Sequence, residues 1–205
     1  MRHLFLLAAL FCACISYAQI RVQERLPKSK TGFALTTAKT RAKIYYDVND
    51  ALVIKRSAEL FARDIQMVTG QKPELIPKRE RAKALVIVGT IEKNQWICEL
   101  AQKGKIDIRP LQGAWERYLI QTVDNPSPGV AKALVIAGSD RRGAAYGLFS
   151  ISEMMGVSPW YWWGDVPVKT HKALYVDAPP TYSKTPSVKS VSYTHLRAHE
   201  TRRHL

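Results

Sequence analysis

Cysteine is scarce in this chain of 205 residues, which contains three. Two of them, Cys12 and Cys14, lie in the apolar N-terminal segment, so that the rest of the chain keeps Cys98 alone. A single cysteine cannot form an internal disulfide, which excludes a disulfide-stapled secreted domain. Cys98 lies in an apolar helical pattern over 96–101, which indicates a buried, unreactive thiol rather than a nucleophile.

A long hydrophobic run is also missing. The apolar stretch Leu4–Ile15 follows a basic residue and measures about a dozen residues, too few to cross a bilayer as a helix. Ser16-Tyr-Ala18 then offers small residues at a cleavage site. We therefore expect residues 1–18 to be a signal peptide, and the protein to be secreted or periplasmic with no membrane span after cleavage. A retained membrane anchor and a lipoprotein attached through Cys14 are the alternatives.

Acidic residues are few, because 17 Asp and Glu stand against 31 Lys and Arg, for a net charge of +14 at pH 7. A basic surface favours acidic partners: nucleic acid, anionic lipid or acidic polysaccharide. An exported protein without a run of Lys and Arg is not expected to bind nucleic acid. The composition thus favours a glycan that carries uronic acid, and a solubilising surface without a ligand is the alternative.

Several common sites lack their essential residues. Residues 138–143 have the glycine spacing of a phosphate-binding loop, but no Lys-Ser/Thr follows them, and no Gly-x-Gly-x-x-Gly is present. Glycoside hydrolysis needs two carboxyl groups that flank one bond, and no carboxylate pair in the sequence suggests this arrangement. The spacing of His195 and His199 suits a metal on one helix face, but the segment around them looks foreign to the protein. We expect no cofactor, no metal site and no catalytic residue in this chain.

The heptads Lys83–Gly89 (KALVIVG) and Lys132–Gly138 (KALVIAG) are almost identical and wholly apolar after the lysine. Such runs predict strands that are buried on both faces. The alternation of strands and helices predicts one α/β domain over residues 19–189, with a mixed, mostly parallel sheet and helices on both faces. The pattern places helices at 50–69, 94–103 and 140–155, and further strands at 42–47, 74–76, 118–122 and 174–177.

The turn after the second heptad reads Ser139-Asp-Arg-Arg142. Ser139 or Asp140 is expected to cap the third helix, as Asn49 or Asp50 is expected to cap the first. Arg141 and Arg142 oppose the dipole at a helix N-terminus, so we expect a partner that compensates for the conflict. Arginines bind carboxylates well, and the partner is either the uronate of a substrate or, as favoured here, a carboxylate of a neighbouring domain.

Aromatic residues gather in Ser158–Pro167 (SPWYWWGDVP), which contains Trp160, Trp162 and Trp163. If the segment is extended, Trp160 and Trp162 share one face, whereas Tyr161 and Trp163 share the other. Aromatic rings at a sheet edge either stack on sugars or pack against another domain. Asp165 is expected near the same edge, as a polar group that orients a ligand and takes no part in catalysis.

A family resemblance is visible in the same region. The motifs that carry it are Gly138-Ser-Asp-Arg-Arg-Gly143, Tyr146-Gly147, Glu153 and Gly156-Val-Ser-Pro-Trp-Tyr-Trp-Trp-Gly-Asp-Val-Pro-Val168. Together they resemble the N-terminal domain of glycoside hydrolase family 115, the xylan α-1,2-glucuronidases. The resemblance covers residues 22–189 and is strongest over 135–176. It implies an enzyme that removes (4-O-methyl)glucuronic acid from glucuronoxylan, with its catalytic carboxylates in a barrel domain that this chain does not contain. The arginines and the aromatic cluster would then meet the sugar or the barrel.

The composition changes after Lys189, and Val191–Thr201 resembles a translated adaptor sequence. We therefore expect residues 190–205 to be an artefactual tail, and the chain to be an N-terminal fragment that is inactive by itself. Two other functions remain open: a non-catalytic glycan-binding module, and the accessory domain of another exo-glycosidase such as a relative of the hexosaminidases.

Overall fold

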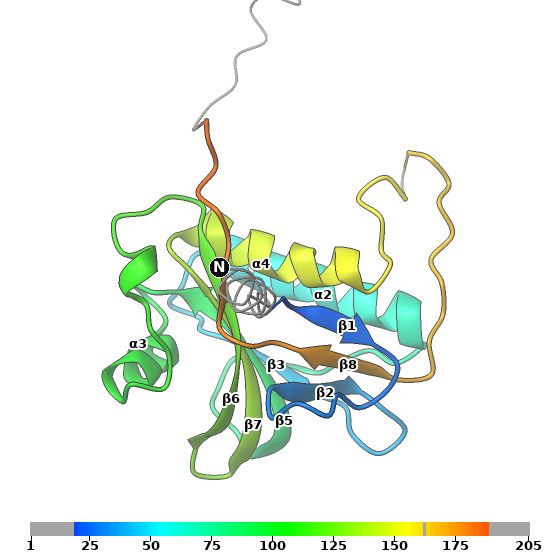
Figure 1. Ribbon diagram of the computed structural model, residues 1–205, viewed down its shortest axis with the longest axis horizontal. Helices are drawn as coiled ribbons and strands as arrows, with labels where there is room; N and C mark the ends of the chain where they lie inside the picture. The colour runs from blue at the N-terminus through cyan, green and yellow to red at the C-terminus, as the bar shows by residue number, and fades with distance from the viewer. Residues whose placement is uncertain (1–18, 162, 189–205) are drawn as a thin grey trace, which may run out of the picture.

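The computed structural model describes residues 19–161 and 163–188, which fold around a six-stranded sheet (Figure 1). Its strands are, in the order in which they lie side by side, β4 (Leu75–Ile76), β3 (Lys43–Tyr46), β5 (Ala82–Thr90), β7 (Val130–Gly138), β6 (Tyr118–Ser127) and β9 (Thr181–Tyr182). The first four are parallel to one another, whereas β6 is antiparallel to both β7 and β9. The predicted mixed, mostly parallel sheet is confirmed.

The two near-identical heptads form β5 and β7, which are neighbours at the centre of the sheet. Their register pairs Leu85 with Ala133 and Val86 with Leu134, one residue out of step with the sequence repeat. Equivalent residues of the repeat therefore point to opposite faces, and Leu85 and Leu134 belong to different core clusters. This offset is tolerated because apolar layers bury both faces of the two strands.

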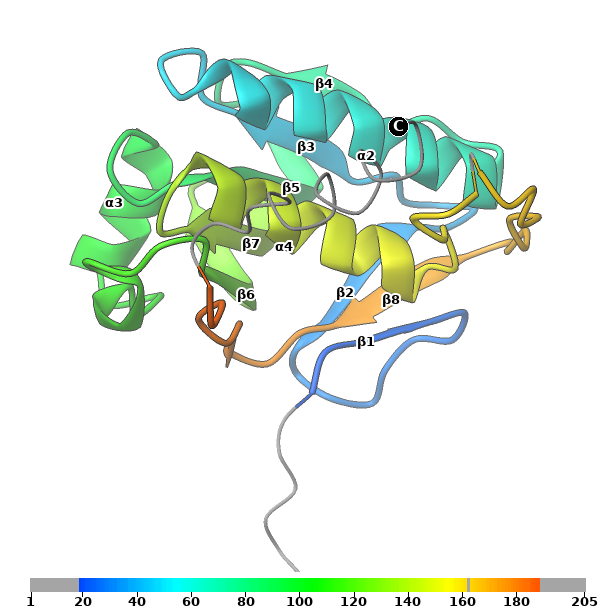
Figure 2. The same cartoon turned by 90° about the horizontal axis from the view of Figure 1, so that it is seen from above.

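Helices cover both faces, as predicted (Figure 2). One face is covered by α2 (Leu52–Thr69) and α4 (Arg141–Met154), which pack on Val86, Leu134 and Ile136. The other face is covered by α3 (Gln95–Gln102) and the short 3-10 helix η1 (Arg109–Leu111), and Trp96 fills it. Among the described residues, no helix combines the length and the apolar character needed to cross a membrane.

A second, smaller sheet was not predicted as a unit. It is antiparallel, and β8 (Leu174–Asp177) lies in it between β1 (Arg21–Gln23) and β2 (Gly32–Thr36). Its inward residues, among them Phe33, Leu35 and Val176, join the core beneath α2 and α4. Strands from near both ends of the described chain thus pair in one small sheet beside α4 (Figures 1 and 2).

The first helix begins later than predicted, and neither Asn49 nor Asp50 caps it. Its N-cap is Ala51, which makes no side-chain cap bond. Asp50 instead accepts hydrogen bonds from the backbone N and the Oγ1 of Thr90, at 2.7 and 3.0 Å. The carboxylate therefore links the start of α2 to the end of β5, a tertiary contact that overrides the local capping preference.

Asn94 caps α3 and ties it to the sheet. Its Oδ1 accepts hydrogen bonds from the backbone N of Trp96 and Ile97, both at 3.1 Å. Its Nδ2 donates to the carbonyl of Val88 at 3.1 Å, and the side chain is fully buried. A Cβ added to Gly89 would lie 2.3 Å from that Nδ2, so the close approach of this side chain requires glycine there.

We expect Asn94→Ala to lower the free energy of unfolding by about 1–3 kcal/mol, because it removes a helix cap and the buried hydrogen bond to the carbonyl of Val88. Urea unfolding followed by circular dichroism measures this. The control is Asn49→Ala at an exposed position, which should change stability by less than about 0.5 kcal/mol. Equal effects at the two positions would contradict the role given to Asn94.

Candidate functional site

The turn that precedes α4 is locked to the loop that precedes β6. Asp140 is the N-cap of α4, as predicted, and its Oδ1 accepts from the backbone N of Arg142 and Gly143 at 2.9 and 2.8 Å. Its Oδ2 accepts from the backbone N of Glu116 at 2.7 Å. A Cβ on Gly143 would lie 2.2 Å from the carbonyl oxygen of Arg117, so the two backbones touch. The glycine spacing of 138–143 therefore serves this packing, and the N–H groups that could bind an anion already bind Asp140.

The two arginines of the turn differ in their partners. Arg142 lies with its Nη1 2.7 Å from Glu116 Oε1 and its Nη2 3.4 Å from the hydroxyl of Tyr146. The hydroxyl of Tyr146, and then the charge of Glu116, raise the pKa of Arg142. The Arg141 side chain is exposed and forms no ion pair or hydrogen bond with another described residue. The ion pair with Glu116 thus offsets the unfavourable interaction of Arg142 with the helix dipole. Arg141 has no such partner among the described residues and is accessible to a binding partner.

The aromatic segment after α4 is folded into turns. The backbone N of Tyr161 donates to the carbonyl of Ser158 at 3.1 Å, and that of Trp163 donates to the carbonyl of Trp160 at 3.0 Å. Pro159 follows Ser158, where a proline favours a tight turn. The expected extended segment with alternating faces is therefore wrong for the residues described here, and Trp162 lies outside them.

The turns direct the rings to different surroundings. Trp160 and Trp163 are 67% and 86% exposed. Tyr161 is half-buried, and its hydroxyl accepts from Arg63 Nη2 of α2 at 2.8 Å, which fastens the segment to that helix. Asp165 is exposed and has a left-handed backbone with φ 46°. Two large rings held in solvent by a fastened segment are typical of a surface that meets a partner.

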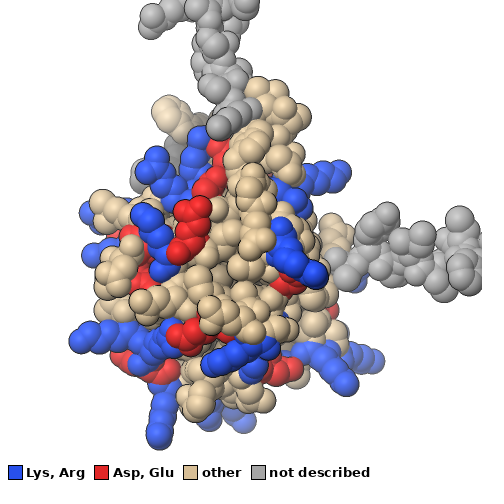
Figure 3. Space-filling model, turned by 90° about the vertical axis from the view of Figure 1, so that its left-hand side faces the viewer, with Lys and Arg blue, Asp and Glu red and all other residues tan. Residues whose placement is uncertain are grey.

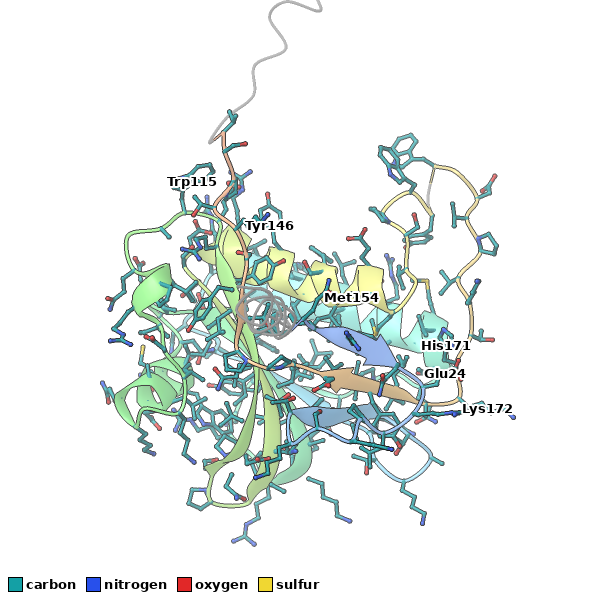
Figure 4. The ribbon with its side chains drawn as sticks, in the orientation of Figure 1. Glu24, Trp115, Tyr146, Met154, His171 and Lys172 are labelled. Carbon is teal, nitrogen blue, oxygen red and sulfur yellow. The ribbon has the colours of Figure 1, made fainter. Side chains whose placement is uncertain are left out.

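The arginines and the rings do not share one edge, contrary to the expectation from sequence. Arg141 begins α4 and the aromatic segment follows its end, so that the 14 residues of the helix separate them by about 21 Å. Figure 4 shows Tyr146 and Met154 along α4, which runs between the two features. They are separate points on one side of the molecule.

A cleft of about 550 Å³ lies between these points and was missed in the sequence. It is lined by residues of α2, α4 and the aromatic segment: Leu60, Arg63, Asp64, Tyr146, Phe149, Ser150, Ser152, Glu153, Val157, Ser158, Pro159 and Tyr161. Tyr146 and Phe149 are 40% and 37% exposed. The signal that could have found them is their spacing, since they are apolar residues three apart on α4, off the face that points to the core.

Asp64 and Ser152 join the two helices within this cleft. Both side chains are buried, and the Ser152 hydroxyl donates to Asp64 Oδ2 at 2.6 Å. Burial raises the pKa of Asp64, although the hydrogen bond from Ser152 and the charge of Arg63 act in the opposite direction. The cleft thus combines apolar rings, a cation and a carboxyl group whose charged form is disfavoured.

The raised pKa of Asp64 gives stability a definite dependence on pH. The folded protein holds this proton more tightly than the unfolded chain, so stability falls as the pH rises through the folded pKa. Asp64→Asn removes the charge and keeps an oxygen that accepts from Ser152. We expect it to raise the free energy of unfolding at pH 7 by on the order of 1 kcal/mol, and to have no such effect near pH 3.

Urea unfolding at the two pH values measures this difference. The exposed Asp165→Asn is the matched control, at which no change is expected. A loss of stability in Asp64→Asn at pH 7 would show that the attraction of Arg63 outweighs the cost of burial.

Comparisons with known proteins agree with this fold. No family model and no curated protein sequence matches the chain. Among solved structures, it is similar to a family GH115 4-O-methyl-α-glucuronidase with specificity for decorated arabinogalactans, at a TM-score of 0.61 and 28% identity. This match covers 77% of the chain and 19% of the enzyme, so the chain spans a small part of that protein.

Two further matches are more distant. A protein named CpGH84D matches at a TM-score of 0.45 and 12% identity, over 78% of this chain and 22% of that one. The GH20 β-N-acetylhexosaminidase from Streptomyces coelicolor A3(2) matches at a TM-score of 0.41 and 13% identity, over 84% of this chain and 26% of that one. From the GH115 match, the chain folds as a domain related to part of a glycoside hydrolase.

Proposed function

We propose that this chain is the N-terminal domain of a secreted glycoside hydrolase that removes (4-O-methyl)glucuronic acid from an acidic polysaccharide. The observation that carries the proposal is the likeness to the GH115 enzyme, together with the motif block over 138–168. Export is part of the proposal and is supported by the apolar run and small residues of 1–18. The catalytic carboxylates would lie in a following barrel domain.

The polysaccharide backbone has two candidates. The motif block resembles the xylan glucuronidases, whereas the similar solved enzyme is specific for decorated arabinogalactans. Both kinds of substrate present a glucuronic acid side chain to the enzyme, and we propose this sugar as the recognised group. Glucuronoxylan is the substrate favoured by the motifs.

We further propose that the surface around α4 seats the catalytic barrel. Its support is the exposure of Trp160 and Trp163, the accessible guanidinium of Arg141, and the apolar cleft between them. Aromatic and arginine side chains are the residues that most often anchor such interfaces. Direct contact of the same residues with the sugar is the alternative, and it requires that the substrate reach the aromatic segment.

The chain alone is expected to release no glucuronic acid from glucuronoxylan or arabinogalactan oligosaccharides above a buffer control, as measured by chromatography of the products. Asp64 and Glu153 both line the cleft, and two carboxyl groups could in principle act as catalytic residues, so the experiment must test this role. If the chain does release glucuronic acid, and if Asp64→Asn or Glu153→Gln abolishes that activity, the catalytic site lies in this cleft and the proposal is contradicted.

In the proposed full-length enzyme, Trp163→Ala is expected to lower kcat/KM by about tenfold. If Trp163 seats the barrel, thermal unfolding should also shift to lower temperature. If it touches sugar, the melting temperature should hold. Leu26→Ala, which truncates another exposed apolar residue, is the control and should leave both measurements unchanged. Unchanged activity in Trp163→Ala would contradict both roles.

A further inference from the structure

A second cleft, of about 790 Å³, lies at the opposite end of the central strands from the N-terminus of α4. Its walls are the start of β5, the residues just after α3, and the tip of the β6–β7 hairpin over 125–129. The hairpin tip forms the lower end of the molecule in Figure 1, whereas β7 ends at Gly138, next to the start of α4. No residue predicted from sequence to bind a ligand lies in it.

The lining of this cleft is basic. It contains Arg81, Lys83, Lys103 and Lys105 and no acidic residue. Arg81, Lys83 and Lys103 are exposed, and none of them forms an ion pair within the described part of the chain. In Figure 3, Lys and Arg side chains fringe the lower end of the molecule. Positive charges gathered in this way create a positive electrostatic potential that attracts anions.

The nearby carboxylates are already engaged elsewhere. Glu80 is bound to Lys43 at 2.7 Å, and Asp124 lies 3.1 Å from Lys132. Glu99 forms two hydrogen bonds with Arg79, at 2.7 and 2.8 Å. Each of these three carboxylates is therefore bound by a cation outside the cleft. Glu99 also feels the charge of Lys103, which helps to lower the Glu99 pKa, but the lining as a whole keeps a net positive charge.

The walls are held in place before any ligand binds. The backbone N of Ala82 donates to the carbonyl of Gly129 at 3.0 Å, and Lys105 donates to the carbonyl of Asn125. Gly129 has φ 87°, and a Cβ there would lie 2.7 Å from Arg81 Cγ, so the stem of Arg81 rests on the hairpin. Pro126 and Pro128 stiffen the same turn. A preformed wall reduces the entropy that binding would cost.

We propose that this cleft binds a polysaccharide that carries uronic acids, an inference that rests on the proposed function for its choice of ligand. Spaced lysine and arginine side chains match carboxylates repeated along a chain, and Asn125 and Ser127 offer polar atoms to hydroxyl groups. Single-stranded nucleic acid is the other polyanion of suitable charge. It is disfavoured because the lining contains no aromatic ring on which bases could stack.

The test uses the purified full chain and a Lys83→Glu, Lys103→Glu double variant. The matched control is Lys28→Glu with Lys93→Glu, which changes the net charge equally at exposed positions outside the cleft. Isothermal titration calorimetry is carried out with oligogalacturonate, with neutral xylo-oligosaccharides and with oligodeoxythymidylate. Circular dichroism confirms that each variant is folded.

Oligogalacturonate should bind the unaltered chain and the control alike. Binding to the cleft variant should be weaker by about tenfold or more, and the affinity of the unaltered chain should fall as NaCl rises from about 50 to about 200 mM. The inference is overturned if oligogalacturonate does not bind, if both variants lose affinity equally, or if the neutral sugar binds as tightly. Tighter binding of oligodeoxythymidylate that the cleft variant loses would overturn it in favour of nucleic acid.

These results are independent of hydrolysis. Binding by the cleft in a chain whose longer form releases no glucuronic acid would sink the proposed function and leave the cleft assigned. Release of glucuronic acid by the proposed full-length enzyme, without binding at the cleft, would support the proposed function and overturn the assignment of the cleft.

Discussion

The burial of both faces of β5 and β7 is the constraint on which the rest of this structure depends. Leu85, Ile87 and Val135 point to one side, whereas Val86, Leu134 and Ile136 point to the other, and all are inaccessible to solvent. Each face therefore needs its own apolar cover. On one side, α3 and its Trp96 supply this apolar cover. On the other, α2 and α4 do so together with the small sheet, and the candidate site is built on the outer surface of that cover.

Much of the fold could be predicted because its central elements carry strong local signals. The heptads are continuously apolar, and each predicted helix has an apolar face and ends next to a glycine, such as Gly70 with φ 71°. The small sheet could be predicted only at β8. Its strand β1 is three residues long, too short for a period of two to be visible, and its existence depends on pairing with residues more than 150 positions away. The role of Asp50 was hidden for the same reason.

The sequence could predict which residues belong to the candidate site, but it could not predict how they are arranged in space. The sequence singled out Arg141, Arg142 and the tryptophans, but it placed them at one edge because it contained no information on the direction of α4. Glu116, the partner of Arg142, lies 26 positions before it and takes up its charge through a tertiary contact. The basic cleft escaped notice for a related reason, since its four cations come from two separate segments of the chain, 81–83 and 103–105.

The position of β8 has a consequence for how this domain forms during synthesis. β1 and β2 lie near the N-terminus, yet neither pairs directly with the other, and both take their hydrogen bonds from β8. During translation these two segments emerge first, and the strand that they share as a partner is missing until residues 174–177 leave the ribosome. Their apolar residues Phe33 and Leu35 are thus exposed while nearly the whole domain is being made. A strand near the C-terminal end of the described residues thus completes the small sheet, and its late synthesis sets the interval during which the nascent domain is open to chaperones or to aggregation.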